Sequence, residues 1–229
     1  MYSELGRKFC DVTGIPRYFV HQAVFELKMS MVRVGAVLRR RRIRGLEISG
    51  DLRLVFGCGD TRYAGWVGID CFRGQAVALQ LDLRRRLPFR DHTVELCYSE
   101  HFLEHLYPEE AERHFAEVFR VLKPGGTYRV AVPAALRFAQ KYLEGDREFF
   151  ALAHPWEPRP FDAVRKVFSW NGEHRTIYDY CQLEHLARQA GFKQVRECQA
   201  NSSPDPRLCI DRPEPQRVAE TLYAEMSTL

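Results

Sequence analysis

The chain has 229 residues, of which 45% are hydrophobic and 28% are charged, values that are ordinary for a globular protein. This length is sufficient for one α/β domain with a short elaboration. The seven cysteines are odd in number and contain no C-x-x-C pair, which argues against a disulfide framework or a zinc ribbon. The first residues do not contain a basic stretch followed by an apolar stretch and a cleavage site, which is the pattern of a signal peptide. We therefore expect no secretory signal and a cytoplasmic location.

The net charge of +4 is unevenly distributed. Residues 1–50 hold 10 Lys and Arg against 4 Asp and Glu, a balance of +6, and the other 179 residues hold 24 against 26, a balance of −2. Most of the excess lies in the cluster Arg39, Arg40, Arg41, Arg42 and Arg44. Such a cluster can meet nucleic acid, a membrane surface or a phosphorylated substrate. It can equally be a solvated helix end, whose carbonyl groups favour cations.

Residues 17–38 are expected to form one helix, because apolar residues recur there at three- and four-residue spacing: Val20, Val24, Leu27, Met31, Val34 and Leu38. Charged residues interrupt the run, so it is not a membrane span. We expect this face to pack on the core, and the alternative is an interfacial membrane helix that ends in arginines. Residues 1–50 are therefore an N-terminal helical segment, basic at its end, and residues 51–229 are the main domain.

From residue 52 onward, short apolar stretches alternate with a helical pattern. Strands are expected over residues 52–56, 66–69, 76–81, 94–98 and 128–132, with a helix over residues 108–122. Lys123-Pro-Gly-Gly126 ends that helix, because proline cannot continue a helix and glycine opens a turn. Strands that alternate with helices indicate a doubly wound α/β fold with a mostly parallel sheet.

The remaining third of the chain has weaker patterns. Residues 145–175 carry several prolines and tryptophans without a clear period. Asp179 is expected to cap a helix that runs to Gln189 and stops at Gly191. Strands are expected over residues 194–198 and 221–226, on either side of a proline-rich loop over residues 202–215.

The strongest local feature is the glycine turn in Leu54-Val-Phe-Gly-Cys-Gly59, at the end of the first strand. Glycine allows a close approach of the backbone to a ligand, and open α/β sheets bind ligands at the carboxyl ends of their strands. Asp70 ends the second strand, where a carboxylate can accept hydrogen bonds from both hydroxyls of a ribose. Neither G-x-G-x-x-G nor a P-loop occurs, which disfavours dinucleotides and nucleoside phosphates. A nucleoside without a pyrophosphate, such as S-adenosylmethionine (SAM), fits better.

A series of motifs occurs in this chain order: Phe56-Gly-Cys-Gly59, Gly65-Trp-Val-Gly-Ile-Asp70, Asp82-Leu83, Leu87-Pro-Phe89, Ser99–Leu106 and Arg120–Gly126. Together these motifs resemble the class I SAM-dependent methyltransferases, in the group that contains the type 11 domain. The resemblance is strongest over residues 52–135 and continues more loosely through 172–192 and 217–225. It implies a Rossmann-like, doubly wound, seven-stranded, mostly parallel sheet, and SAM as the cofactor.

The resemblance also implies roles for individual residues. Gly57, Cys58 and Gly59 would line the methionine part of SAM, Asp70 would hold the ribose, and Asp82 and Leu83 would flank the adenine, with Asp82 accepting from its amino group. Ser99, Glu100 and His101 would face the methyl donor and acceptor. The complete set of expected cofactor residues is Phe56, Gly57, Cys58, Gly59, Asp60, Asp70, Cys71, Asp82, Leu83, Ser99 and Glu100.

Two features depart from the family pattern. Nine residues separate Phe56 from Trp66, whereas a parallel crossover usually needs a dozen or more. The first crossover helix must therefore be about one turn or absent. Residue 55 is valine where many members of the family carry an acidic residue, so recognition of the methionine amino group must come from elsewhere, and Asp60 is the candidate.

The segment His101-Phe-Leu-Glu-His105 matches the H-x-x-E-H pattern of inverted zinc proteases. A catalytic zinc would need a third protein ligand, and the segment follows a strand of a nucleoside-binding sheet. We therefore expect no metal, and a packing or hydrogen-bonding role for His105. His101 is the candidate general base, because a histidine with a pKa near 6.5 can take a proton from an acceptor hydroxyl.

The acceptor pocket is expected to involve His174, Arg175 and Tyr178, at the end of an acceptor-side insertion over residues 145–175. The same cluster also fits a polar loop with a helix cap. The function expected is transfer of a methyl group from SAM to a small-molecule or glycan-linked acceptor, at oxygen. The alternatives are an RNA methyltransferase, which the arginine cluster favours, and a non-catalytic SAM-binding module, which the short crossover favours.

Overall fold

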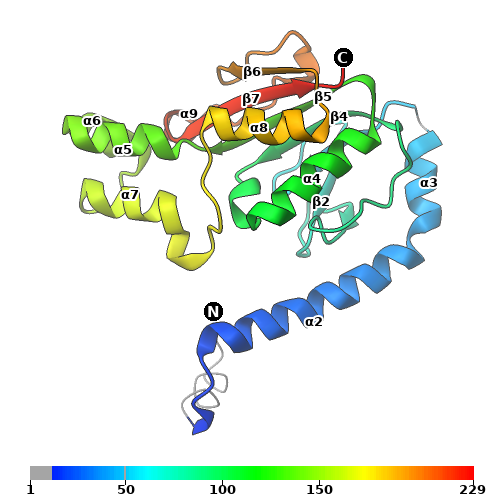
Figure 1. Ribbon diagram of the computed structural model, residues 1–229, viewed down its shortest axis with the longest axis horizontal. Coiled ribbons are helices and arrows are strands. Elements are labelled where there is room, and N and C mark those ends of the chain that lie inside the picture. The colour runs from blue at the N-terminus through cyan, green and yellow to red at the C-terminus, as the bar shows by residue number, and fades with distance from the viewer. Residues whose placement is uncertain (1–11, 49) are drawn as a thin grey trace.

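A computed structural model describes residues 12–48 and 50–229 (Figure 1). Its centre is a seven-stranded sheet in the order β3-β2-β1-β4-β5-β7-β6. Every strand pair is parallel except β5–β7 and β6–β7, which are antiparallel. The strands are β1 Arg53–Phe56, β2 Val67–Asp70, β3 Leu79–Gln80, β4 Val94–Glu100, β5 Leu122–Pro133, β6 Gln194–Cys198 and β7 Thr221–Ser227. The doubly wound, mostly parallel sheet expected from the sequence is confirmed.

Helices α4 (Pro108–Val121) and α8 (Tyr180–Ala190) pack against one face of the sheet and against each other (Figure 1). The main core lies beneath them and includes Phe56, Phe115 and Val130. The other face of β1 and β4 is covered by the loops around Tyr63, Trp66 and Ile210, which pack on Val55, Cys58 and Tyr98. Loops cover this face because the chain between β1 and β2 contains no helix, as the short crossover predicts.

Several expected boundaries shift in the structure. The strand expected over residues 76–81 is reduced to Leu79–Gln80 at the edge of the sheet. The segment Lys123–Gly126 is part of β5 and not a separate turn. The pairing with β4 shifts from Val94↔Leu122 to Leu96↔Thr127, so the extra residues bulge from β5. The capped helix is confirmed: the Asp179 side chain accepts a hydrogen bond from the Gln182 N–H, and Gly191 follows the helix in the left-handed conformation.

The proline-rich stretch over residues 145–175 contains two helices that the sequence did not predict, α6 (Arg147–Ala153) and α7 (Pro160–Ser169). Pro160 occupies the first turn of α7, where the missing N–H would have no partner within the helix. Together with α5 (Ala135–Glu144) these helices enclose a second small core around Phe138 and Phe150. The remaining elements of the described chain include α9 (Pro215–Glu220) and the 3₁₀ turns Leu103–His105, Trp170–Gly172 and Pro206–Leu208, of which only Trp170–Gly172 lies in this stretch.

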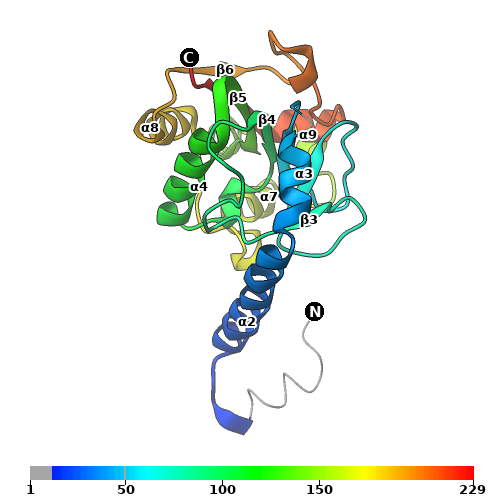
Figure 2. The ribbon, with the colours of Figure 1, turned by 90° about the vertical axis from the view of Figure 1, so that its right-hand side faces the viewer.

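The N-terminal segment forms α2 (Arg17–Leu38) and α3 (Arg40–Ile48), so the expected helix is confirmed. In Figures 1 and 2, α2 extends along and beyond the body of the molecule, and α2 contacts β3. The expectation that its sequence-defined apolar face packs on the core is wrong: Leu27, Met31 and Val34 are 66%, 66% and 65% exposed, whereas Met29 is 1% exposed. The helix is apolar on two opposite sides, so spacing alone could not select the buried one.

No helix within the described residues is long and apolar enough to cross a membrane. The exposed apolar residues of α2 are interrupted by Glu26, Lys28 and Arg33. A charged residue at the centre of a bilayer costs about 2.5–3.5 kcal/mol, so these side chains are incompatible with a spanning helix.

Buried His114 on α4 gives a first prediction. Its ring is 1% exposed, and burial lowers the pKa of His114 from 6.5 to about 4. Below pH 6.5 the unfolded chain binds this proton while the folded chain does not, so folding stability is lost as the pH falls toward 4. We expect His114 to contribute about 3 kcal/mol to this loss. Urea unfolding of wild type and His114→Gln at pH 7 and pH 4 checks this, and an equal acid loss in both proteins would contradict it.

Candidate functional site

A cavity of about 490 Å³ opens at the carboxyl ends of β1 and β2. We call it the strand-end cavity. Gly57 and Asp70 form its floor, and the segment after β4 forms a second wall through His101, Phe102 and His105. Much of the remaining wall comes from residues that the sequence did not predict in a site: His21, Gln22, Phe25 and Met29 of α2, together with Phe72, Arg84, Leu106, Tyr107, Glu110 and Glu173.

The glycine turn after β1 is fixed by hydrogen bonds to the end of β2. The Gly57 N–H donates to the Ile69 carbonyl over 2.9 Å, and the Gly59 N–H donates to Asp70 Oδ2 over 3.0 Å. Gly57 has φ of +66°, and a Cβ atom there would lie 2.8 Å from the Cβ of Phe102. Glycine is therefore required at residue 57 both by the backbone conformation and by the close approach of Phe102.

Gly57→Ala is expected to lower the free energy of unfolding by about 2–4 kcal/mol, because strain in the left-handed region adds to a steric clash. Gly145→Ala is the matched control, since Gly145 has φ of +70° with nothing within 4 Å of the added Cβ, and it should cost only about 1–2 kcal/mol. Urea unfolding measures both values. Equal losses would show that Phe102 imposes no constraint.

Asp70 lies at the edge of the strand-end cavity with both carboxylate oxygens oriented by backbone groups. Oδ2 accepts from Gly59, and Oδ1 accepts from the Phe72 N–H over 2.9 Å. A carboxylate offers about four lone-pair positions, so two remain for other donors. The arrangement fixes the Asp70 side chain while leaving acceptor capacity toward the cavity.

Asp82 lines the same cavity but is fully engaged. Its two oxygens accept four hydrogen bonds, one from Arg33 of α2 and three from Arg84. This leaves no lone pair for an adenine amino group, which was the role expected for Asp82. Arg84 also donates to Glu26 of α2, and the hydrogen bonds of Arg84 hold the pKa of Glu26 below its usual value. These contacts tie α2 to the cavity wall.

The other expected cofactor residues divide into two sets. Cys71 and Leu83 line the strand-end cavity. Phe56, Cys58, Gly59, Asp60, Ser99 and Glu100 do not line it. The Ser99 hydroxyl lies 2.8 Å from the Tyr128 hydroxyl, and Glu100 accepts from Tyr63, Tyr98 and Arg212. Burial raises the pKa of the Cys58 thiol to about 11.

His101 lines the cavity, but both of its ring nitrogens have partners. Nδ1 lies 3.0 Å from Nη1 of Arg217, and Nε2 lies 2.9 Å from Oγ1 of Thr221. Because arginine only donates, Nδ1 is the acceptor and Nε2 carries the proton. Burial and the charge of Arg217 place the pKa of His101 well below its ordinary value. His101 would have to release one of these partners before it could take a proton from an acceptor.

Of the residues expected at the acceptor side, only Arg175 lines the strand-end cavity, and it lies over the Tyr107 ring at 5.2 Å. The Tyr178 hydroxyl donates to the Leu103 carbonyl. His174 stacks on Trp170, with Nδ1 2.6 Å from the Val167 carbonyl. His174 instead meets Glu104 and His105, and one ligand atom from each of the three lies within 4.8 Å of the others.

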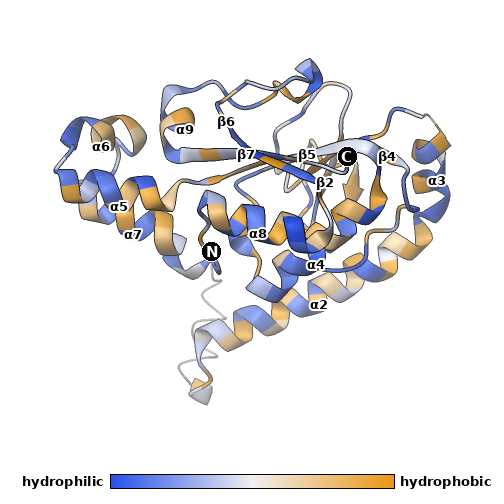
Figure 3. Cartoon of the chain, turned by 45° about the horizontal axis from the view of Figure 1, so that its top comes forward, coloured by the Kyte–Doolittle hydropathy of each residue, from blue (hydrophilic) through white to orange (hydrophobic). Residues whose placement is uncertain are grey.

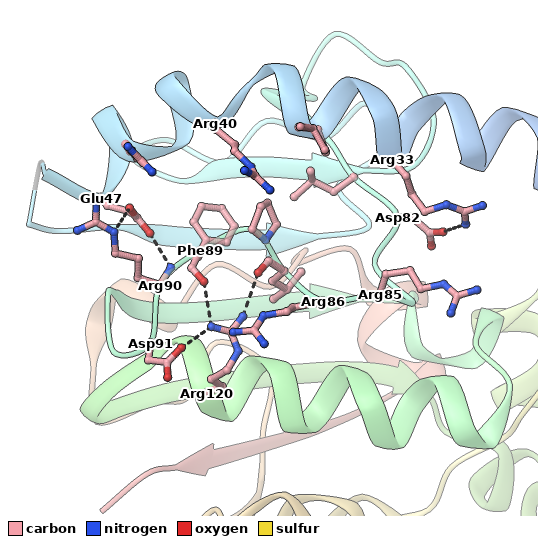
Figure 4. Close-up of a pocket in the computed structure, with 16 residues that line it drawn as sticks. Arg33, Arg40, Glu47, Asp82, Arg85, Arg86, Phe89, Arg90, Asp91 and Arg120 are labelled. Carbon is pink, nitrogen blue, oxygen red and sulfur yellow. Dashed lines mark hydrogen bonds and ion pairs between the residues drawn. The ribbon is translucent and has the colours of Figure 1, made fainter.

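A second cavity of about 820 Å³ lies between α2, α3 and the segment over residues 81–91. We call it the arginine groove, because it is lined by Arg33, Arg40, Arg44, Arg85, Arg86, Arg90 and Arg120. Figure 4 shows Arg120 bonded to Asp91 and Arg90 beside Glu47, whereas Arg40, Arg85 and Arg86 lie without a marked partner. Three acidic residues, Glu47, Asp82 and Asp91, share the lining, so the groove is strongly basic.

Residues 70–130 match the type 11 model of the methyltransferase domain. No curated protein matches the chain. Among solved structures, the chain is similar to a SAM-dependent methyltransferase from Thermotoga maritima, described as a possible histamine N-methyltransferase. That likeness has 16% identity and a TM-score of 0.49, and covers 93% of this chain and 97% of that one.

Two further structures are similar at the same level. A SAM-dependent methyltransferase from Methanosarcina mazei has 16% identity and a TM-score of 0.45 over 78% of this chain and 93% of its own. A phosphoethanolamine N-methyltransferase from Haemonchus contortus, in complex with SAM, has 13% identity and a TM-score of 0.44 over 77% of this chain and 48% of its own. Residues 70–130 thus match a methyltransferase domain, and they lie within a doubly wound sheet with an antiparallel β7, the fold that the resemblance to class I methyltransferases implies.

Proposed function

We propose that the chain transfers the methyl group of SAM to a hydroxyl of a small-molecule or glycan-linked acceptor. The observation that carries this proposal is the continuity of the strand-end cavity, which runs from Gly57 and Asp70 at the strand ends to Glu173 and Arg175 on the far side. One end has the groups that a nucleoside needs, and the other has polar groups for a second ligand. Residues 145–175, which end at Arg175, are proposed as the acceptor-side insertion.

The residues at the strand ends fit SAM. When bound, SAM supplies an electrophilic methyl group on a sulfonium. Asp70 would accept from the ribose hydroxyls through its remaining lone pairs, and the glycine turn would admit the methionine portion. Phe25, Phe72 and Leu83 offer apolar surface for the adenine ring. Since Asp82 is saturated by arginines, adenine would be selected by this apolar contact and not by the Asp82 carboxylate.

The acceptor end favours a small polar molecule or the end of a glycan. The guanidinium of Arg175, the carboxylate of Glu173 and the hydroxyl of Tyr107 all contribute to the wall there, and such groups orient hydroxyl-bearing ligands by hydrogen bonds. Displacement at a sulfonium requires mainly proximity and alignment. The chain's task is therefore to hold an acceptor oxygen in line with the methyl group and to remove its proton.

Transfer of labelled methyl from SAM to extracted small molecules and glycans tests this function. The expected product carries the label in an alkali-stable ether, as O-methylation requires. Label in an amine would contradict transfer to oxygen, and label in RNA would favour the nucleic-acid alternative. SAM binding without transfer to any extract would favour the non-catalytic alternative.

A further inference from the structure

Glu104, His105 and His174 converge from two distant parts of the chain. Glu104 and His105 lie in the 3₁₀ turn after β4, and His174 follows the turn after α7. One ligand atom from each lies within 4.8 Å of the other two, and the rings of His105 and His174 are 5.2 Å apart. His105 also lines the strand-end cavity, so the group lies at the edge of the proposed active site.

The Glu104 carboxylate is buried without a partner. Its residue is 1% exposed, and neither oxygen has a hydrogen-bond donor among the described residues. The nearest cationic candidate, Nδ1 of His101, is 3.7 Å from Oε1 and already accepts from Arg217. An unpaired buried carboxylate is costly, and most such groups in folded proteins are paired or bind metals.

Both histidines are held in the manner of metal ligands. Nδ1 of His174 lies 2.6 Å from the Val167 carbonyl, and Nδ1 of His105 lies 3.3 Å from the Glu173 carbonyl. A carbonyl can only accept, so Nδ1 carries the proton in each ring and Nε2 keeps a free lone pair. This is the arrangement by which backbone carbonyls orient metal-binding histidines and fix their tautomer.

We propose that Glu104, His105 and His174 bind a divalent transition-metal ion, with Zn²⁺ and Mn²⁺ as the best matched ions. Two imidazoles and one carboxylate are a known catalytic set, which leaves coordination positions open for another ligand. This inference rests on the proposed function, because the open positions would take the acceptor oxygen. The H-x-x-E-H segment thus contributes Glu104 and His105 to the site, and His174 in place of His101 completes it.

The metal ion would allow the acceptor hydroxyl to lose its proton, a role for which His101 is not free because both of its ring nitrogens are hydrogen-bonded. A divalent ion lowers the pKa of a coordinated hydroxyl, so the acceptor proton passes to bulk water without a protein base. The acceptor oxygen then uses a lone pair to form its bond to the methyl carbon as the carbon–sulfur bond breaks. That bonding pair remains on sulfur, so the products are a methyl ether and the neutral thioether S-adenosylhomocysteine.

Metal binding is tested without SAM or acceptor, so its failure is distinguishable from failure of the proposed function. The full chain is stripped with a chelator and titrated with Zn²⁺ and Mn²⁺ by calorimetry. We expect one equivalent to bind, with affinity at least about tenfold weaker in Glu104→Gln and His174→Ala. His185→Ala, which removes an exposed histidine of α8, should bind as wild type does. Equal affinity in all four proteins would overturn the proposal.

Thermal unfolding of Glu104→Leu provides a second readout. With chelator present, this variant should melt at a higher temperature than wild type, because it removes a buried carboxylate without a partner. Adding Mn²⁺ should raise the melting temperature of wild type and leave that of Glu104→Leu unchanged. An equal metal-induced shift in both proteins, or none in either, would overturn the proposal.

An independent observation concerns the outer face of α2. Hydrophobic positions recur along α2 (Figure 3). We define the apolar stripe as Val20, Val24, Leu27, Met31, Val34 and Leu38, which helical spacing places on the side opposite the buried Met29 and Val32. Five of its six side chains are 47–81% exposed, and α2 spans 22 residues, or about 33 Å. A continuous exposed apolar surface of this length indicates an interaction site.

Unpaired arginines continue from the end of the stripe. Arg40, Arg41, Arg42 and Arg44 of α3 are exposed, and within the described part of the chain no ion pair engages them. Arg85 and Arg86 line the arginine groove together with Arg40 and Arg44, also without an ion pair among those residues (Figure 4). Residues 12–48 hold eight Lys and Arg against two Asp and Glu, so this side of the molecule attracts anions.

We propose that the apolar stripe and these arginines dock α2 and α3 onto an anionic phospholipid surface. An amphipathic helix with an apolar face and arginines matches such a surface. Nucleic acid would leave the apolar stripe without a partner, and a second copy would bring like charges together. Since Phe25 and Met29 on the opposite face of α2 wall the strand-end cavity, docking would place that cavity next to the membrane.

Vesicle flotation tests the docking surface with the full chain. Vesicles of phosphatidylcholine with phosphatidylglycerol should retain wild type, and vesicles of phosphatidylcholine alone should not. Leu27→Asp/Met31→Asp should lower retention at least about tenfold, and Arg41→Gln/Arg42→Gln about 25-fold. Leu143→Asp on α5, at a residue that is 86% exposed, is the matched control and should not change it.

Three other outcomes would contradict the docking of α2 and α3 on an anionic membrane. Dimerisation that Leu27→Asp/Met31→Asp abolishes, without vesicle binding, would overturn the proposal in favour of a second copy. Salt-sensitive RNA binding that the same variant leaves intact, without vesicle binding, would overturn it in favour of nucleic acid. Equal retention on neutral and anionic vesicles would remove the role of the arginines.

Discussion

Arg129→Leu is expected to lower the free energy of unfolding by about 3–5 kcal/mol, because it leaves the buried Asp211 carboxylate without its cation and leaves buried Glu225 with only the half-exposed Arg196. Arg129 on β5 is 0% exposed. Its guanidinium donates to Asp211 and to Oε1 of Glu225, at 2.7 Å in the latter case, and to the carbonyls of Gln199 and Ser202. It thus connects β7 and the loop after β6 to the centre of the sheet.

Arg196→Leu is the matched control, because Arg196 pairs with the other oxygen of the same Glu225 from a side chain that is 47% exposed. An exposed ion pair of this kind contributes at most about 1 kcal/mol. Urea unfolding at neutral pH measures both variants. Similar losses for Arg129→Leu and Arg196→Leu would mean that burial adds nothing to the Arg129 contacts.

Asp70→Ala is expected to weaken SAM binding at least about a hundredfold. Each hydrogen bond from a ribose hydroxyl to a charged carboxylate contributes about 1.5–3 kcal/mol, and the substitution also frees the Gly59 and Phe72 N–H groups that Asp70 now orients. Asp70→Asn keeps one oxygen acceptor and should give an intermediate affinity. Equilibrium dialysis with labelled SAM measures all three proteins, and unchanged binding by Asp70→Ala would remove Asp70 from the cofactor site.

Much of the fold could be predicted from the sequence because its signals are local. The apolar stretches before Gly57 and up to Asp70 mark two strand ends, and Asp179 and Gly191 mark the ends of one helix. The short stretch between Phe56 and Trp66 also predicts the missing crossover helix. These features depend on propensity, capping and chain length, all of which are present in a continuous segment.

The contacts of the site could not be predicted in the same way, because they join distant residues. The saturation of Asp82 requires Arg33, which belongs to a helix whose buried face the spacing left undecided. The pairing of both His101 nitrogens requires Arg217 and Thr221 from near the other end of the chain. Likewise, no local pattern links His174 to the turn that holds Glu104.

The central claim, that the strand-end cavity holds SAM, is tested most directly by calorimetric titration of the wild-type chain with SAM and with S-adenosylhomocysteine. The cavity formed by Gly57, Asp70 and the inner face of α2 predicts one binding site for each ligand, with micromolar affinity. Absence of heat with both ligands, confirmed by the absence of any shift in melting temperature, would contradict the assignment of this cavity to SAM.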